Sequence, residues 1–245
     1  MIIDAHCHVD IRFGWVHTPE VLLSMMDSCN IDKSLVTSYA DLPCADDPDS
    51  LQRFLNAVDT NKARILGGYF RANPWFKEKA ISLFREAIAG HNIIGLKIHP
   101  VSIVAAPSSP LVIDLIKEAS RHGAPTLVHT GDEPNALPHH VEKAGRECSD
   151  AIIIMAHMGG NFYWKDAIRV AKENKNIFLD TSGIPSVNAI QKAVDELGPE
   201  RIIFGSDAPA MDPSVEITKI ERLNLGKTDE EKVFAKNILN ILPKR

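Results

Sequence analysis

The chain has 245 residues, 44% of them hydrophobic, which is enough to bury a large core. Its 27 Lys and Arg residues against 32 Asp and Glu residues give a net charge of -5, and no basic run is present to follow a phosphate backbone, so nucleic acid is not expected as a partner. No stretch reaches the roughly 20 apolar residues of a membrane span, and four scattered cysteines without a preceding signal sequence predict a cytoplasmic protein with reduced thiols.

Short apolar runs rich in β-branched residues recur along the chain at intervals of about 25 to 35 residues, as expected for strands. The eight predicted strands are Ile2–His6, Ser34–Ser38, Ile65–Arg71, Ile93–Ile98, Thr126–His129, Ile152–Ala156, Asn176–Thr181 and Arg201–Ser206. Segments with helical periodicity lie between them. The first helix is expected after Thr18 as N-cap with Pro19 as its first residue, and a final helix is expected over Thr228–Leu242.

Eight strands that alternate with helices predict a closed parallel (β/α)8 TIM barrel, an α/β fold that often uses about 250 residues as one domain. A doubly wound sheet is the alternative, but it usually has fewer strands and a glycine-rich phosphate-binding turn after the first strand. The sequence contains no G-x-G-x-x-G. We therefore expect a single domain over residues 1–245, with the C-terminal helix closing the barrel.

In such a barrel the chemistry lies at the C-terminal ends of the strands. The first strand ends in His6-Cys7-His8, and alternate residues of a strand point to the same side, so the two imidazoles form half of a metal site. The other predicted strand ends also carry polar or titratable side chains that converge on the same mouth. These are Arg71 and Asn73, Lys97 and His99, His129, His157 and Asp207.

These motifs carry a resemblance to a known family. The order DAHCH, VHTG, AHMGG and FGSDAP along the chain resembles the amidohydrolase superfamily, and most closely its amidohydrolase 2 branch of hydrolases and decarboxylases. The resemblance extends to the last helix, which contains Phe234-Ala235-Lys236-Asn237-Ile238-Leu239. It implies a metal-dependent enzyme.

The resemblance implies that His6, His8, His129 and Asp207 hold the metal, with His157 as an acid or base or as ligand to a second metal. Zinc is expected, with manganese, iron or cobalt as alternatives, and one metal is favoured over two. Three imidazoles and a carboxylate leave a position for water, whose pKa the cation lowers toward about 7. Asp207 is the expected base, and His157 is the expected proton donor, since histidine side chains ordinarily titrate close to neutral pH.

Other residues at the mouth have two possible roles each. Lys97 is either a carboxylated bridge between two metals or a substrate contact. Arg71 either clamps a substrate carboxylate or forms an ion pair at the rim. His99 is a candidate substrate donor. Asp4 either orients a ligand histidine from behind or satisfies local backbone donors, and Cys7 is expected to face the helices.

The loop after the first strand, with Phe13, Gly14, Trp15 and His17, either covers the mouth as a lid or packs as a surface loop. We expect a hydrolase in which water attacks a small, carboxylated substrate. The alternative is a non-oxidative decarboxylase of a small unsaturated or aromatic acid, and a non-catalytic metal-binding barrel is the third possibility. The expected partner is a small molecule, and a homodimer is possible.

Overall fold

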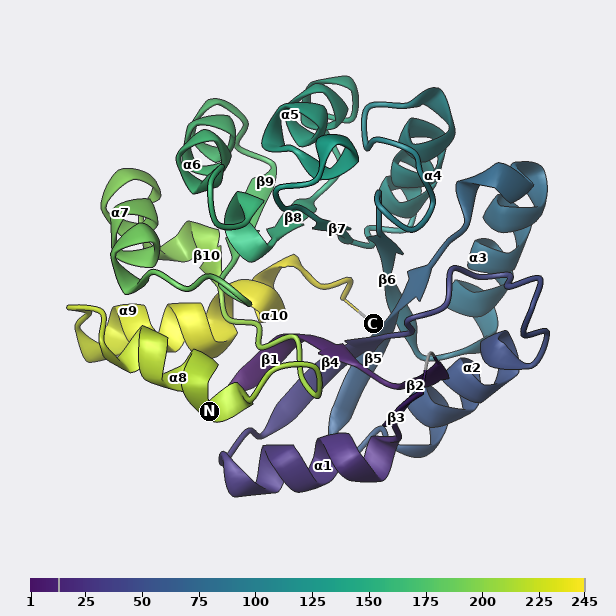
Figure 1. The fold of residues 1–245 in the computed structure, drawn as a ribbon, viewed down its shortest axis with the longest axis horizontal. Coiled ribbons are helices and arrows are strands. Elements are labelled where there is room, and N and C mark those ends of the chain that lie inside the picture. Colours follow the sequence, from purple (N-terminus) through teal and green to yellow (C-terminus); the bar gives the residue numbers. More distant parts are fainter. Residues whose placement is uncertain (13, 245) are drawn as a thin grey trace.

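The computed structural model describes residues 1–12 and 14–244, and eight parallel strands form its centre (Figure 1). In sheet order they are β1 (Ile3–His8), β4 (Lys33–Thr37), β5 (Ile65–Arg71), β6 (Ile93–Ile98), β7 (Thr126–His129), β8 (Ile153–Ala156), β9 (Ile177–Asp180) and β10 (Ile202–Ile203). A parallel bridge between Cys7 and Ala208 joins the first strand to the segment after the last. The predicted (β/α)8 barrel is confirmed.

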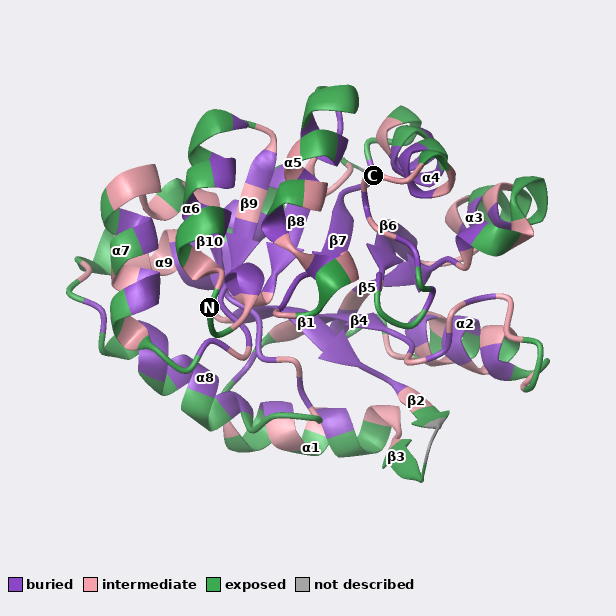
Figure 2. Cartoon of the chain, turned by 45° about the horizontal axis from the view of Figure 1, so that its top comes forward, coloured by how far each residue is buried: buried purple, intermediate pink, exposed green. Residues whose placement is uncertain are grey.

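Helices surround the barrel, with buried residues on their inner faces and exposed residues on their outer faces (Figure 2). They are α1 (Pro19–Ser28), α2 (Ser50–Thr60), α3 (Glu78–Gly90), α4 (Pro110–Arg121), α5 (Pro138–Glu147), α6 (Trp164–Glu173), α7 (Val187–Leu197) and α8 (Pro213–Glu221). Short 3₁₀ turns are η1 (Pro74–Phe76), η2 (Pro134–Ala136), η3 (His157–Gly159) and η4 (Pro199–Arg201). Proline begins several of these helices, where its missing N–H costs nothing.

The C-terminal segment closes one end of the barrel. It runs through α9 (Lys227–Glu231), the π-helical turn η5 (Lys232–Lys236) and α10 (Asn237–Ile241), close to the predicted Thr228–Leu242. Ile238 and Ile241 pack with Ile3 and Leu35 in the apolar interior of the barrel. The Asn237 side-chain amide donates to backbone carbonyls at the start of β10. This end is therefore filled, and the opposite end is left for the site.

A β-bulge in β1 changes which residues face the interior. The register against β4 shifts between Asp4 and Cys7, and such a shift reverses the alternation of side chains. Ala5 packs in the barrel interior, whereas Cys7 packs in the layer between strands and helices, as expected. Asp4 consequently accepts from the backbone N–H of His6 at 3.2 Å and of Ser206 at 2.9 Å. Asp4 therefore satisfies local backbone donors, which was one of its two expected roles.

The eighth predicted strand is shorter than Arg201–Ser206. Its ladder covers only Ile202–Ile203 because Phe204 donates its N–H to Val233 of the C-terminal segment. Asp207 then adopts a left-handed backbone conformation, with φ of 64°, which is rare for a residue other than glycine. The turn brings the Asp207 N–H to within 2.7 Å of the His6 carbonyl oxygen, so the last and first strand ends lie side by side.

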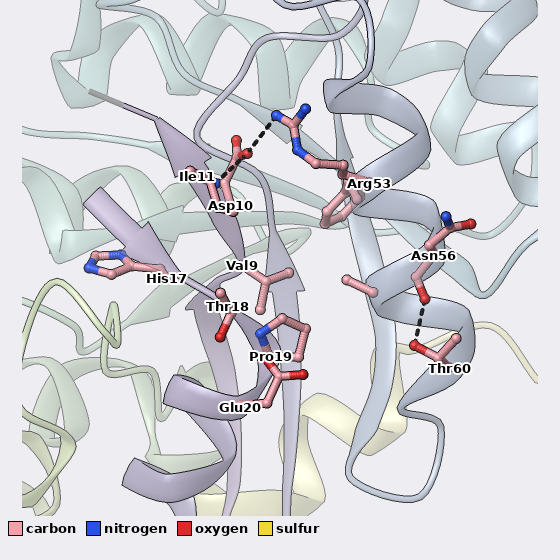
Figure 3. Close-up of a pocket in the computed structure, with 12 residues that line it drawn as sticks. Val9, Asp10, Ile11, His17, Thr18, Pro19, Glu20, Arg53, Asn56 and Thr60 are labelled. Atoms are coloured by element: carbon pink, nitrogen blue, oxygen red, sulfur yellow. Dashed lines mark hydrogen bonds and ion pairs between the residues drawn. The ribbon is translucent and has the colours of Figure 1, made fainter. Parts of the chain in front are cut away.

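The loop after β1 forms a hairpin of β2 (Asp10–Arg12) and β3 (Trp15–His17). A cavity of about 330 Å³ lies between this hairpin and α2. Figure 3 shows that Arg53 of α2 reaches toward Asp10, while His17 points away from α2. Asp10 also accepts from the backbone N–H groups of Tyr39 and Ala40, both at 3.0 Å. The hairpin is thus fixed to the end of β4. The predicted lid residue Phe13 lies outside the described residues.

Among the described residues, no helix combines the length and the hydrophobicity that crossing a bilayer requires.

Candidate active site

A cavity of about 340 Å³ opens at the C-terminal ends of the strands. It brings together the predicted site residues of six strand ends with residues of the neighbouring loops. The lining residues are His6, His8, Trp15, Tyr39, Arg71, Lys97, His99, Ser102, His129, His157, Asp207 and Ala210. Asn73 instead begins η1, where its side chain accepts from the N–H of Trp75.

Two groups from the end of β9 hold the imidazole of His6. Its Nδ1 lies 3.0 Å from Oδ2 of Asp180 and 3.1 Å from Oγ of Ser182. The Ser182 hydroxyl donates its own proton to Asp180, so both neighbours accept from His6 and its hydrogen is on Nδ1. The lone pair of His6 is therefore on Nε2, as a metal ligand requires, with a carboxylate behind it.

The Nε2 atom of His6 faces a second acceptor. It lies 3.4 Å from Oδ1 of Asp207, and Nε2 of His8 lies 2.9 Å from the same oxygen. The lone pair on His6 Nε2 and the carboxylate oxygen of Asp207 repel each other unless a positive group lies beside them. The Lys97 ammonium, 2.9 Å from His6 Nε2, is one such group. A divalent cation also fits, because ligand atoms of His6, His8 and Asp207 lie within 4.8 Å of one another.

His129, the fourth predicted ligand, lines the same cavity but lies outside that compact group. Its ring stacks on His99 with centroids 4.2 Å apart and meets the ring of His157 at 4.8 Å. Its Nε2 is buried and has no hydrogen-bond partner among the described residues; the Glu133 carboxylate, at 3.8 Å, is beyond hydrogen-bond distance. An orphaned buried nitrogen at this place supports His129 as a ligand, which stays a prediction.

His157 lies immediately after β8 in a strained turn. It and Met158 have left-handed φ values of 60° and 45°, a conformation that costs energy and occurs often at functional sites. Nδ1 of His157 lies 3.1 Å from the carbonyl oxygen of Ser182 and 3.0 Å from its Oγ. Both are acceptors, since that hydroxyl proton is given to Asp180, so Nε2 of His157 carries the lone pair.

Arg71 forms an ion pair, one of its two expected roles, while its contact with a substrate carboxylate stays a prediction. Its Nε donates to Oδ1 of Asp41 at 2.6 Å and its Nη2 donates to Oγ of Ser102 at 2.8 Å. The guanidinium is therefore fixed by an ion pair, yet it still lines the cavity and gives it a positive wall. His99 beside it accepts from the N–H of Ser102 through Nδ1 at 3.3 Å.

An aromatic group covers the His8 side of the cavity. The Tyr39 ring is stacked on His8, with centroids 4.2 Å apart and an interplanar angle of 3°. The hairpin adds His17, whose Nδ1 is 3.1 Å from the Tyr39 hydroxyl, and Trp15, whose ring meets Tyr39 edge-on at 5.1 Å. The first loop therefore forms part of the wall of the cavity, which is consistent with the predicted cover.

The chain was compared with known protein sequences, families and structures. None of the curated protein sequences compared with the chain matches it. The family model described as amidohydrolase matches residues 3–244, almost the entire chain. The chain belongs to the amidohydrolase family. The predicted resemblance is thus confirmed, and with it the enzyme class: a metal-dependent enzyme of the amidohydrolase type.

Solved structures share the fold of this amidohydrolase at low sequence identity. A 5-carboxyvanillate decarboxylase from Sphingomonas paucimobilis has a TM-score of 0.75 at 14% identity, with 98% of each chain covered. A dihydroxybenzoic acid decarboxylase from Polaromonas sp. JS666, with bound manganese and the inhibitor 2-nitroresorcinol, gives 0.74 at 14%, covering 98% of this chain and 96% of the other. A probable 2-pyrone-4,6-dicarboxylic acid hydrolase from Acinetobacter baumannii, with bound citric acid, gives 0.72 at 14%, covering 98% of each.

Burial sets the protonation states of this amidohydrolase site. It lowers the pKa of His6 to about 3 and that of His129 to about 4, so both rings are neutral at pH 7, as ligands must be. Burial and the charge of Arg71 lower the pKa of His99 as well. Burial also lowers the pKa of Lys97 to about 7, against the attraction of Asp207, which raises it.

Several residues of the site had not been predicted: Ser102 and Ala210 in the cavity wall, and Asp180, Ser182 and Tyr39, which contact the histidines. Asp180 and Ser182 follow the seventh strand, and Tyr39 follows the second; neither strand end contributed a candidate. Asp180 and Ser182 could have been found from the polar run Asp180-Thr181-Ser182-Gly183, which comes at the end of an apolar strand. Tyr39 had no such signal, because its role depends on stacking against His8.

Proposed function

We propose that this single-domain amidohydrolase is a hydrolase in which water attacks an acyl or related carbon of a small anionic substrate. The observation that carries the proposal is the lone pair of His6 Nε2, 3.4 Å from Asp207 Oδ1, in the same cavity as His157. We further propose zinc as the metal, with manganese, iron or cobalt as alternatives. We also propose that the enzyme is cytoplasmic and forms a homodimer.

The proposed metal ligands are His6, His8 and Asp207, with His129 as the fourth. A divalent cation held there supplies Lewis acidity, which makes water a nucleophile near neutral pH. The neutral state of the imidazoles and the carboxylate behind His6 suit this donor set.

The other steps are assigned to side chains of the chain itself. Asp207 accepts a proton from the attacking water, because its carboxylate lies at the centre of the site. The proton accepted by Asp207 passes to Nε2 of His157, which carries a lone pair, and from there to the leaving group, since Nδ1–H of His157 is engaged by Ser182. Arg71 orients an anionic group of the substrate, and Tyr39 and Trp15 exclude water from the His8 side.

Decarboxylation of a small unsaturated or aromatic acid is the second candidate function. It is supported by the aromatic rings of Tyr39 and Trp15 at the cavity, which offer apolar contact to an aromatic substrate, and by the decarboxylases among the similar structures. In this reaction His157 would deliver a proton to the substrate carbon and Arg71 would hold a carboxylate. Hydrolysis needs only one anion contact. Arg71 has few N–H groups left for a second, because it already donates to Asp41, to Ser102 and to the carbonyl oxygen of Ser38.

The test is a substrate screen of the metal-loaded enzyme. Small carboxylated lactones, esters and amides form one set, and benzoate-like and muconate-like acids form the other, with incorporation of ¹⁸O from water and release of carbon dioxide as readouts. We expect hydrolysis that is lost in His6→Ala. Carbon dioxide release without a hydrolytic product, abolished by Arg71→Ala and by removal of metal, would overturn the hydrolase proposal in favour of the second candidate.

A further inference from the structure

One peptide group connects His157 to a buried carboxylate on α8. The carbonyl oxygen of Ser182 lies 3.1 Å from Nδ1 of His157, from which it accepts. The N–H of the same peptide belongs to Gly183 and donates to Oε2 of Glu216 at 3.3 Å. Glu216 therefore holds, from behind, the peptide that holds the imidazole.

Glu216 is one member of a buried ion pair. Its side chain is 4% exposed, and Nζ of Lys219, one helical turn further along α8, lies 2.5 Å from its Oε2. Lys219 also donates to the carbonyl oxygen of Ile184 at 2.7 Å. The pair thus holds two neighbouring residues of the loop after β9: Glu216 accepts from Gly183, and Lys219 donates to Ile184.

This loop has little room to shift without moving His157. Gly183 has φ of +69°, and a Cβ atom on it would lie only 3.2 Å from Nδ1 of His157 and 3.3 Å from Cε of Met211. Both the conformation and the close approach require glycine at this position. A displacement of the Ser182–Gly183 peptide would therefore change the hydrogen bond to the imidazole directly.

We propose that Glu216 and Lys219 are positioning residues that fix the tautomer and orientation of His157 through the Ser182–Gly183 peptide. This deepens the proposed function, on whose assignment of proton transfer to His157 it rests. Donation from the peptide N–H to a carboxylate polarises the peptide and strengthens its carbonyl as an acceptor. The hydrogen of His157 is then kept on Nδ1, and its lone pair stays on Nε2 for the substrate.

The effect of losing the pair is expected to be partial. Oγ of Ser182 is a second acceptor for Nδ1 of His157 at 3.0 Å, and it is oriented independently by Asp180. We therefore expect kcat to fall about tenfold, less than the roughly 10²- to 10⁴-fold that a general acid–base group contributes, with KM nearly unchanged. The ligand His6 keeps its contact with Asp180, so metal content should not change.

The test replaces both members together, because removal of one leaves an unpaired buried charge that would destabilise the fold. Glu216→Leu/Lys219→Met removes the acceptor for the Gly183 N–H, whereas Glu216→Gln/Lys219→Met keeps an oxygen there without the charge. Glu221→Leu is the control, since Glu221 is an exposed residue of the same helix. All variants are compared with the wild type in their zinc-loaded, full-length form.

The decisive readout is ¹⁵N NMR of the imidazole nitrogens, with the His157 signals assigned by their loss in His157→Gln. We expect hydrogen on Nδ1 in the wild type, the Gln/Met variant and the control, and a mixture of tautomers in the Leu/Met variant. A wild-type tautomer in Leu/Met would overturn the proposal. A mixture of tautomers in Gln/Met would also overturn it, because that variant keeps an acceptor oxygen for the Gly183 N–H, and this second criterion still applies if Leu/Met does not fold.

Activity adds a second readout that separates this proposal from the proposed function. Where a substrate turns over, kcat of Leu/Met should fall with KM nearly unchanged, while Gln/Met stays close to the wild type. If no substrate of either set turns over, the proposed function fails, but the NMR comparison still decides whether Glu216 and Lys219 set the tautomer.

Discussion

Nδ1 of His6 and Oδ2 of Asp180 lie 3.0 Å apart although 174 positions separate the two residues in the chain. The contact joins the ends of the first and seventh strands of the barrel. Asp180 also accepts from the N–H of Ser182 at 2.6 Å through its other oxygen. One carboxylate thus fixes the ring nitrogen that carries hydrogen in His6 and holds the loop that contacts His157.

Asp180→Asn should weaken metal binding. The amide oxygen should remain toward the Ser182 N–H, so the NH₂ group would face His6 Nδ1 and force its hydrogen onto Nε2. We expect zinc affinity to fall about 10- to 100-fold with the fold retained, as measured by competition with a chromophoric chelator. Asp195→Asn, at an exposed position, is the control. Equal affinity in Asp180→Asn and the wild type would show that the contact does not orient a ligand.

The barrel and the polar strand ends were predictable because they depend on local patterns. Apolar runs of strand length and a His-x-His step need only the alternation of side chains. The role of Asp4 was not, since it depends on a bulge that appears only when β1 pairs with β4. Asp180 and Ser182 were visible as polar residues, but their pairing with His6 requires the barrel to close, so that only β10 separates the seventh strand from the first.

Metal stoichiometry tests the ligand set and the role of Lys97. Purified protein should contain close to one equivalent of a divalent transition metal, and His6→Ala and His129→Ala should lose most of it. Elemental analysis of the three proteins measures this. Lys97→Met should keep its metal if Lys97 is a substrate contact. A wild-type value near two equivalents that falls in Lys97→Met would instead support a carboxylated bridge.

Glu118 gives a prediction about stability away from the site. Its carboxylate is buried on α4 and accepts from Arg85 at 2.5 and 2.9 Å, from Arg121 at 2.6 Å and from His122 at 3.1 Å. The hydrogen bonds from Arg85, and then those from Arg121 and His122, lower its pKa from 4.5 to about 2. A pKa below that of the unfolded chain means that the ionised carboxylate stabilises the fold above pH 4.5.

Glu118→Gln should therefore lower the free energy of unfolding at pH 7 by on the order of 1 to 2 kcal/mol, a value reduced because both arginines are largely exposed. The difference from the wild type should shrink as the pH falls from 4.5 through 2. Urea denaturation at pH 7 and at pH 3 measures it, with Glu221→Gln as an exposed control. A difference that is the same at both pH values would contradict the assigned pKa.

Asp207→Asn should abolish turnover while leaving the fold intact. The amide matches the carboxylate in shape, so the contact of its oxygen with His8 Nε2, 2.9 Å in the wild type, can persist, but an amide cannot accept a proton from water. We expect kcat to fall by about 10²- to 10⁴-fold at saturating metal. His157→Asn should also be slow, because the imidazole nitrogen that takes up the proton and passes it on is removed. Circular dichroism and thermal unfolding check the fold, and metal content checks occupancy, since a lost ligand alone would also reduce activity. A metal-loaded, folded Asp207→Asn with near wild-type kcat would show that Asp207 holds the site together without taking part in proton transfer.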